Sequence, residues 1–179
     1  MKKRGFTLAE VLIALTLVGV IAAMTMPSVV TNSKAKTNVA KLASTVSALE
    51  NAFATMMISE AVQNITETKF GDIQNPNFEE LEKYLKITKI EKDKIITMKN
   101  GAVIELKKDK GQGALMRIDI DINGKGNKPD AYGVDKFLFA IGNNGTLYPA
   151  GGDIYNEMYP NDETGSCTAT IVEKGYTIK

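Results

Sequence analysis

The chain has 179 residues, contains no histidine and no tryptophan, and has a single cysteine, Cys167. The missing histidine excludes a Ser-His-Asp triad, a Cys-His nucleophile and an imidazole metal site, and a lone cysteine cannot form an intramolecular disulfide. The formal net charge of +1 argues against nucleic-acid binding as the main activity, so we predict no nucleic-acid partner. The length is enough for one anchor and one modest domain.

The first 26 residues combine a basic head, a glycine and an apolar run. Residues 2–4 (Lys-Lys-Arg) precede Gly5, and the run over residues 6–26 contains one charged residue, Glu10. A run of about 20 apolar residues can span a bilayer as a helix, and it exceeds the core of about 7–15 residues in an ordinary secretory signal. A carboxylate at the centre of a membrane costs roughly 2.5–3.5 kcal/mol. We therefore interpret Glu10 as a functional residue that meets a positive group.

The order of these residues resembles a known processing signal. Gly5-Phe6-Thr7-Leu8-Ala9-Glu10 followed by the apolar run is similar to the signal of type IV pilins and type II secretion pseudopilins. The resemblance implies that a prepilin peptidase cuts between Gly5 and Phe6 and methylates the new amine of Phe6. It also implies that Glu10 pairs with the Phe6 amine of a neighbouring subunit. Breaking a buried ion pair costs about 3–5 kcal/mol, so Glu10 would set the register of assembly.

The resemblance also implies partners and a location. The partners are other pilin or pseudopilin subunits, in a homopolymer or heteropolymer, the prepilin peptidase and an inner-membrane assembly platform. The basic head is expected to stay on the cytoplasmic side of the bacterial inner membrane, so the single-pass chain would place its C-terminal domain outside the cytoplasm. Removal of the three basic residues at positions 2–4 would change the net charge from +1 to −2.

The helical pattern continues beyond the apolar run. One long helix is predicted from Phe6 to about Ser59, and Pro27, where the resembling family has a helix-bending proline, is expected to kink it. After the run, apolar residues recur at spacings of three and four: Val39, Leu42, Val46, Leu49, Phe53 and Met56. This stripe predicts packing on a sheet of the same chain. Lys34, Lys36 and Lys41 are expected to face solvent or neighbouring subunits.

Short elements are predicted after the helix. In chain order they are a loop over 64–77, a helix over 78–85 capped by Asn77, a hairpin of 95–98 and 102–106, a strand over 115–122, a strand over 137–141, a turn at 142–145 leading into 146–148, a polar loop over 151–165 and a last hairpin of 168–172 and 176–178. Asn100-Gly101 favours a type I′ turn in the first hairpin. The order of one helix and then strands predicts an α+β fold with an antiparallel sheet laid on the helix. The expected domains are a leader at 1–5, a membrane helix at 6–26, an amphipathic continuation at 27–60 and a head at 61–179.

An acidic segment is the one candidate metal site. Asp119-Ile120-Asp121-Ile122-Asn123-Gly124 fits the opening of a calcium loop, D-x-[DN]-x-[DN]-G. Asp130 is the twelfth residue counted from Asp119, and Asp135 is within reach of a wrapped loop. No helices flank the segment, so it is not an EF-hand, and Lys125 places a positive charge in it. The alternative is the solvent face of a strand followed by a turn, and both interpretations stay open.

The stretch from Asp119 to Pro149 is similar, more loosely, to a C-terminal region of pseudopilin-like proteins. It carries an acidic D-x-N-G loop, a G-x-D-x-F strand at Gly133 and a G-x-x-Y-P turn at Gly145. Some secretion pseudopilins hold calcium in this part of the fold, so calcium is the only cofactor that the resemblance suggests, and none is certain.

The sequence is compatible with three functions. The resemblance implies a structural subunit of a type II secretion pseudopilus or a type IV pilus, and we predict that the chain is not an enzyme. The alternatives are a calcium-binding adhesive or ligand-binding head anchored in the membrane, and a DNA-uptake pseudopilin. An enzyme would have little beyond Asp119 and Asp121 for acid–base chemistry.

Overall fold

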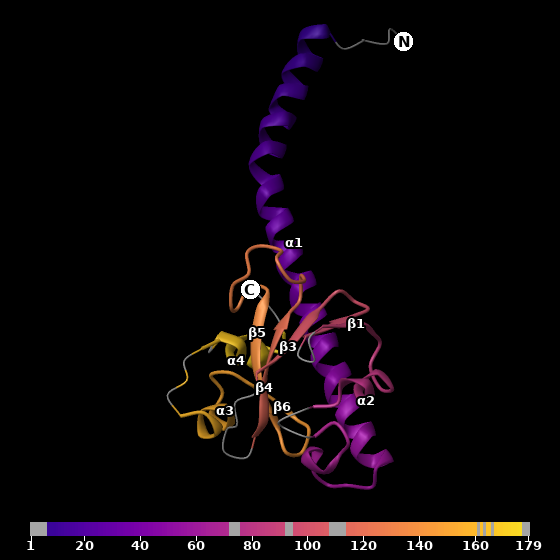
Figure 1. The fold of residues 1–179 in the computed structure, drawn as a ribbon. Helices are drawn as coiled ribbons and strands as arrows, with labels where there is room; N and C mark the ends of the chain where they lie inside the picture. The colour runs from indigo at the N-terminus through magenta and orange to yellow at the C-terminus, as the bar shows by residue number, and fades with distance from the viewer. Residues whose placement is uncertain are drawn as a thin grey trace, which may run out of the picture. The chain divides into compact units, whose positions relative to one another are not determined.

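The computed structural model describes residues 7–71, 76–91, 95–107, 114–160, 162, 164–165 and 167–176. The chain divides into two compact units, Met1–Lys36 and Thr37–Lys179. A long helix, α1 (Leu8–Ser59), begins in the first unit and ends in the second (Figure 1). The predicted long helix is therefore confirmed for residues 8–59. Pro27 falls within α1, but its side chain lies outside the described part, and the kink stays a prediction.

The second unit is a head with one antiparallel sheet. Its strands are β1 (Ile87–Glu91), β2 (Ile95–Met98), β3 (Val103–Lys107), β4 (Ala114–Asp121), β5 (Lys136–Gly142) and β6 (Leu147–Pro149). Each strand pairs with the next along the chain, so β1 and β6 are the two edges. Its short helices are η1 (Ile65–Glu67), α2 (Phe78–Glu82), α3 (Asp153–Met158) and α4 (Cys167–Glu173). The predicted α+β class with the helix at the N-terminus is confirmed.

The apolar stripe of α1 forms one side of the main core. Val39, Leu42, Val46, Leu49, Phe53 and Met56 are at most 5% exposed. All of them but Val39 share one cluster with side chains from β2 to β5, among them Ile104, Ile118 and Phe137. Phe53 also stacks on Phe70 at 5.6 Å between ring centroids. The helical spacing therefore predicted the buried face correctly, because spacings of three and four put these side chains on one side of the helix.

Two polar residues of α1 also bind the sheet. The Lys41 ammonium donates to the backbone carbonyl of Ile122, and Thr45 Oγ1 accepts from Asn100 Nδ2 at 3.0 Å. The prediction that Lys41 faces solvent or a neighbour is therefore wrong, whereas Lys34 and Lys36 are exposed. The long stem of Lys41 lets its ammonium reach past the apolar stripe to the carbonyl that follows β4. Burial lowers the pKa of Lys41, and the charge of Asp121 opposes this effect.

The opposite face of the sheet is covered as well. Leu138 and Ala140 of β5 pack with Tyr155 of α3 in a second apolar cluster, and all three are fully buried. Strand β5 is therefore covered on both faces, which explains why residues 137–141 are a continuous apolar run without alternation.

The first hairpin has a different turn from the one predicted. Met98 N donates to Ala102 O at 2.8 Å, so a three-residue loop joins β2 and β3. Gly101 has a φ of +80° while Asn100 does not have a positive φ, and a type I′ turn needs a positive φ at both central residues. The Asn100 side chain donates to Thr45 and accepts from Ala102 N at 3.0 Å, so it is held by the head and not by a tight two-residue turn.

Other boundaries differ from the sequence predictions. Asn77 does cap α2, because its side chain accepts from Glu79 N, but α2 ends at Glu82. Strand β1 was not predicted, and α3 occupies part of the expected loop over 151–165. The strand predicted over 168–172 is wrong, because these residues belong to α4; residues 177–179, which include the end of the expected hairpin, lie outside the described part.

Tertiary contacts explain helix α4. Its β-branched residues favour strands, but Thr168 Oγ1 accepts from Leu138 N at 3.2 Å. The backbone of Ala169 donates to the carbonyl of Ala150 at 3.0 Å. Packing on β5 and on the segment after β6 therefore overrides the local preference of these residues.

Candidate functional site

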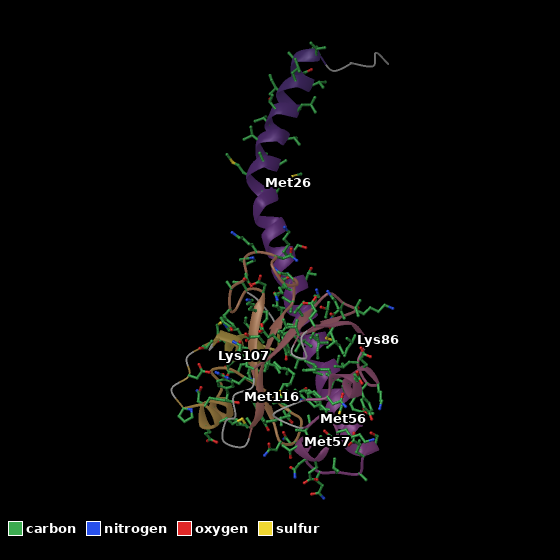
Figure 2. All side chains as sticks on the ribbon, in the orientation of Figure 1. Met26, Met56, Met57, Lys86, Lys107 and Met116 are labelled. Carbon is green, nitrogen blue, oxygen red and sulfur yellow. The ribbon has the colours of Figure 1, made fainter. Side chains whose placement is uncertain are left out.

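The first candidate site is the apolar start of α1. Between Leu8 and Met26 the large apolar side chains are 46% to 81% exposed. Of the helices in the described part of the chain, only this segment is long and apolar enough to cross a membrane, as judged by length and composition. An apolar surface of this extent on a soluble protein marks a surface that lipid or other chains cover. Figure 2 shows these side chains as sticks along the helix.

Glu10 closes a reciprocal cap at the start of this helix. Glu10 Oε2 accepts from Thr7 N at 2.8 Å and from Thr7 Oγ1 at 2.9 Å. Glu10 N donates back to Thr7 Oγ1 at 3.3 Å. This is a capping box, with threonine at the N-cap and glutamate three residues later. The Thr-x-x-Glu spacing is the sequence signal for this cap, which was not predicted.

The cap leaves part of the carboxylate available. A carboxylate offers about four acceptor positions, and no described residue donates a hydrogen bond to Glu10 Oε1. Glu10 also shares one strip of the helix surface with Val11, Ala14, Leu15 and Val18. An acid at one end of an apolar strip can accept a cationic donor from another chain at the same depth. Gly5 and Phe6, the predicted cleavage and methylation residues, lie outside the described part, so their roles stay predictions.

The second candidate site is the acidic loop after β4. Asp121 Oδ1 accepts from Asn123 N at 3.1 Å and from Gly124 N at 2.9 Å, so it caps the turn that follows the strand. Asp135 is fully buried. Its Oδ2 accepts from Asn123 Nδ2 at 2.7 Å and from Asp130 N at 2.8 Å, and its Oδ1 accepts from Ala131 N at 2.7 Å. Asp135 thus holds both ends of the loop together.

The other two acids pair with lysines. Lys107 Nζ lies 2.7 Å from Asp119 Oδ2, which also accepts from Tyr132 OH at 2.9 Å. Lys136 Nζ lies 2.6 Å from Asp130 Oδ1. Burial opposes the charge on Lys107, but the hydrogen bond and charge of Asp119 outweigh it and raise the pKa of Lys107. Burial raises the pKa of Tyr132, and Asp119 raises it further.

The structure therefore places the candidate ligands around one loop, but they contact different partners. Asp121 and Asp135 are linked through Asn123, whereas Asp119 and Asp130 each bind a lysine. Within the described ranges, no group of three or more aspartates, glutamates or cysteines is arranged so that it could hold a metal ion. Asp119 and Asp121 are 9% and 7% exposed, so the alternative of a solvent-facing strand does not describe them, and calcium binding stays a prediction. Burial raises the pKa of Asp121, against hydrogen bonds from Gly124 and Asn123.

A third polar cluster was not found from the sequence. Arg117 of β4 pairs with Asp162, which also accepts from Tyr155 OH at 2.8 Å. The guanidinium lies 4.9 Å from the ring centroid of Tyr159. Burial favours the neutral acid, but hydrogen bonds from Thr164 and Tyr155 and the charge of Arg117 lower the pKa of Asp162. Arg117 and Asp162 are 45 positions apart, so no local pattern could have joined them.

Comparison with known proteins bears on the first site. Residues 1–26 match the family model of the prokaryotic N-terminal methylation motif. This motif is the prepilin-type signal of type IV pilins and pseudopilins, so the resemblance seen in the sequence is confirmed. No curated protein and no solved structure matches the chain. The motif and the apolar helix together fit a membrane-anchored subunit of the pilin type.

Proposed function

We propose that the chain is a structural subunit of a type II secretion pseudopilus or a type IV pilus. A prepilin peptidase would cut it after Gly5, and an inner-membrane platform would polymerise it with other pilin or pseudopilin subunits through its N-terminal helix. The observation that carries the proposal is the methylation motif at residues 1–26, with Glu10 as the only charge on an exposed apolar segment of 19 residues. A subunit of this kind performs no catalysis of its own.

The geometry at Glu10 supports this role. Cleavage after Gly5 would create a cationic amine at Phe6 in every subunit. A carboxylate and an ammonium a few ångströms apart attract strongly once lipid and neighbouring helices exclude water. Glu10 Oε2 accepts from Thr7, whereas no described residue donates to Oε1, so Oε1 would accept such an amine from another subunit. The apolar side chains around Glu10 would then pack against the helix of that neighbour.

The orientation follows from charge. The basic residues 2–4 favour the cytoplasmic side of the inner membrane, so the head would lie outside the cytoplasm before and after assembly. The alternative in which the filament serves DNA uptake has the same topology and the same processing. A comparison of secretion, surface pili and DNA uptake between a deletion strain and its parent would separate these uses of the filament.

The test of the proposal is the intact mass and N-terminal peptide of the protein from its native membrane. A chain that starts at N-methylated Phe6 supports the proposed subunit. A chain that starts at Met1 contradicts it and makes the protein a plain membrane anchor. A chain that starts beyond Ala22 contradicts it as well and makes the protein an ordinary secreted one.

Calcium binding by the acidic loop is a separate proposal. Asp119 Oδ1 and Asn123 Oδ1 are buried and accept no hydrogen bond from the described residues, and a bound cation would satisfy such oxygens. Calcium should then raise the melting temperature of the wild-type chain, and Asp119→Asn should remove the shift. The matched control is Asp153→Asn, because Asp153 is exposed on α3. Equal melting with calcium and with a chelator would refute the proposal and leave an internally satisfied loop.

A further inference from the structure

An apolar groove lies on the head beside α1. It has a volume of about 560 Å³ and is lined by Ala48, Tyr84, Leu85, Lys86, Met98, Lys99 and Asn100. Leu85 and Met98 are each 6% exposed and form its apolar floor, and Lys86 and Lys99 are exposed at its rim. An apolar hollow with a polar rim is typical of a protein–protein contact.

The rim carries two lysines, Lys86 and Lys99, that no described acid neutralises. Lys99 N donates to the carbonyl of Lys86 at 2.9 Å, which holds these two residues side by side. No described residue forms an ion pair with either ammonium. The nearby Lys83 and Lys89, in contrast, pair with Glu80 and Glu91. A partner for the groove should therefore present an apolar side chain with acids next to it.

Helix α3 of the same chain has this composition on its surface. Ile154 is 49% exposed, and Asp153 and Glu157 are exposed beside it. Asp153 and Glu157 are four residues apart, so they lie on one face of the helix with Ile154 next to them. No described residue forms an ion pair with either acid. The two acids are thus equal in number and opposite in charge to the two lysines of the groove.

The groove and α3 lie at opposite edges of the sheet. Lys86 comes directly before β1, one edge strand, whereas α3 contacts β6, the other edge strand. In the common view of the two figures, the labelled Lys86 lies on the right flank of the head and α3 on the left flank. A chain therefore cannot fill its own groove with its own α3. A contact between two different patches is heterologous, and its repetition gives an open row of subunits.

We propose that the groove takes α3 of a second copy of this chain, with Ile154 on the apolar floor and with Asp153 and Glu157 beside Lys86 and Lys99. The proposal rests on the proposed function, because it supplies a contact between heads along a filament whose helices already associate. The proposed contact lies on the head, whereas the proposed function depends on the N-terminal segment. An experiment can therefore refute one proposal without the other.

The first experiment is a disulfide ladder in cells that process the chain. Lys86→Cys and Asp153→Cys in one chain should give dimers, trimers and higher species on mild oxidation. Each single variant should give no species beyond those that the native Cys167 forms in the wild-type chain. The matched control is Lys125→Cys with Asp153→Cys, because Lys125 is an exposed lysine on the loop after β4. A ladder of equal length in the control, or no ladder with Lys86→Cys and Asp153→Cys, would overturn the proposal.

A charge-reversal series tests the same contact without cysteines. Lys86→Glu with Lys99→Glu should lower the amount of filament by about tenfold, because it places like charges against α3. Adding Asp153→Lys and Glu157→Lys to that chain should restore it, whereas Lys125→Glu with Lys128→Glu, which changes the net charge equally, should have no effect. Failure of the restoration would overturn the proposed contact. Processing of all variants at Phe6 would leave the proposed function intact, whereas a wild-type chain that starts at Met1 would refute that function instead.

Discussion

Asp135→Asn should destabilise the head by about 2–4 kcal/mol. The Asp135 carboxylate is fully buried and accepts three hydrogen bonds, two at Oδ2 and one at Oδ1. Asparagine has nearly the same shape but replaces one oxygen with an amino group. In the less costly orientation its carbonyl keeps the two bonds at the Oδ2 position, and its amino group faces the backbone N–H of Ala131.

The magnitude follows from that single mismatch. A hydrogen bond to a charged acceptor contributes about 1.5–3 kcal/mol, and a buried donor without a partner costs about 1–3 kcal/mol. These two terms overlap, because both describe the lost Ala131 contact, so a sum near 2–4 kcal/mol is expected. Asp135→Ala leaves three donors without an acceptor and should be the more damaging change. Asp153→Asn, at an exposed site with no described partner, should stay within about 0.5 kcal/mol of wild type.

Pulse proteolysis of the full chain in detergent across a urea series measures this difference. With a slope of about 2 kcal/mol per molar urea, the midpoint for Asp135→Asn should fall by about 1–2 M. The midpoint for Asp153→Asn should not move. A midpoint for Asp135→Asn within about 0.3 M of wild type, equivalent to less than 1 kcal/mol, would show that Asp135 does not hold the loop and would refute the reasoning.

Three further predictions concern processing, assembly and pH. Gly5→Glu should block cleavage, because peptidases of this class need a small residue at the cut; an N-terminus still found at Phe6 would contradict this. Glu10→Val should leave membrane insertion unchanged but reduce incorporation into filaments made with wild-type subunits, measured in sheared filaments against total membrane protein, and normal incorporation would contradict the pairing role. The Tyr155→Phe variant should lose less of its free energy of unfolding at alkaline pH than the wild-type chain does. Burial raises the pKa of Tyr155, so its stabilising contribution is complete below about pH 10 and falls above it by up to about 1.4 kcal/mol per pH unit as the unfolded chain ionises. Urea midpoints at pH 9 and 11 test this, and an equal loss in both proteins would refute it.

Periodicity explains which parts of the fold could be predicted. The stripe from Val39 to Met56 reflects burial of one face of α1, and burial there follows sequence spacing directly. The alternation over residues 115–122 predicted strand β4, although its charged face is covered as well, with Asp119 and Asp121 buried. The same signal is too weak where few side chains of an element are buried. Strand β1 has mostly exposed or half-buried residues, and α3 has only one fully buried side chain, Tyr155. Neither element leaves a periodic pattern long enough to detect.

The acidic loop shows a second limit of sequence reasoning. A D-x-D-x-N-G segment offers oxygen acceptors on a tight turn, and a cation and a set of backbone N–H groups can both use them. In the structure Asp121 and Asp135 accept from five donors in the loop itself. The sequence identified the residues that shape this loop, but it could not rank the two uses, because the donors come from positions up to twelve residues away.

The observed cap at Glu10 and its proposed ion pair with another subunit can be ranked by their magnitudes. A capping interaction contributes about 0.5–2 kcal/mol, whereas an uncompensated charge in a buried ion pair costs about 3–5 kcal/mol. The bond to Thr7 can therefore hold the carboxylate before assembly without competing strongly against the amine of a neighbouring Phe6. It follows that Thr7→Val, which keeps the backbone N–H but removes the hydroxyl, should affect assembly less than Glu10→Val. An equal loss for the two variants would mean that the cap, and not the ion pair, determines incorporation.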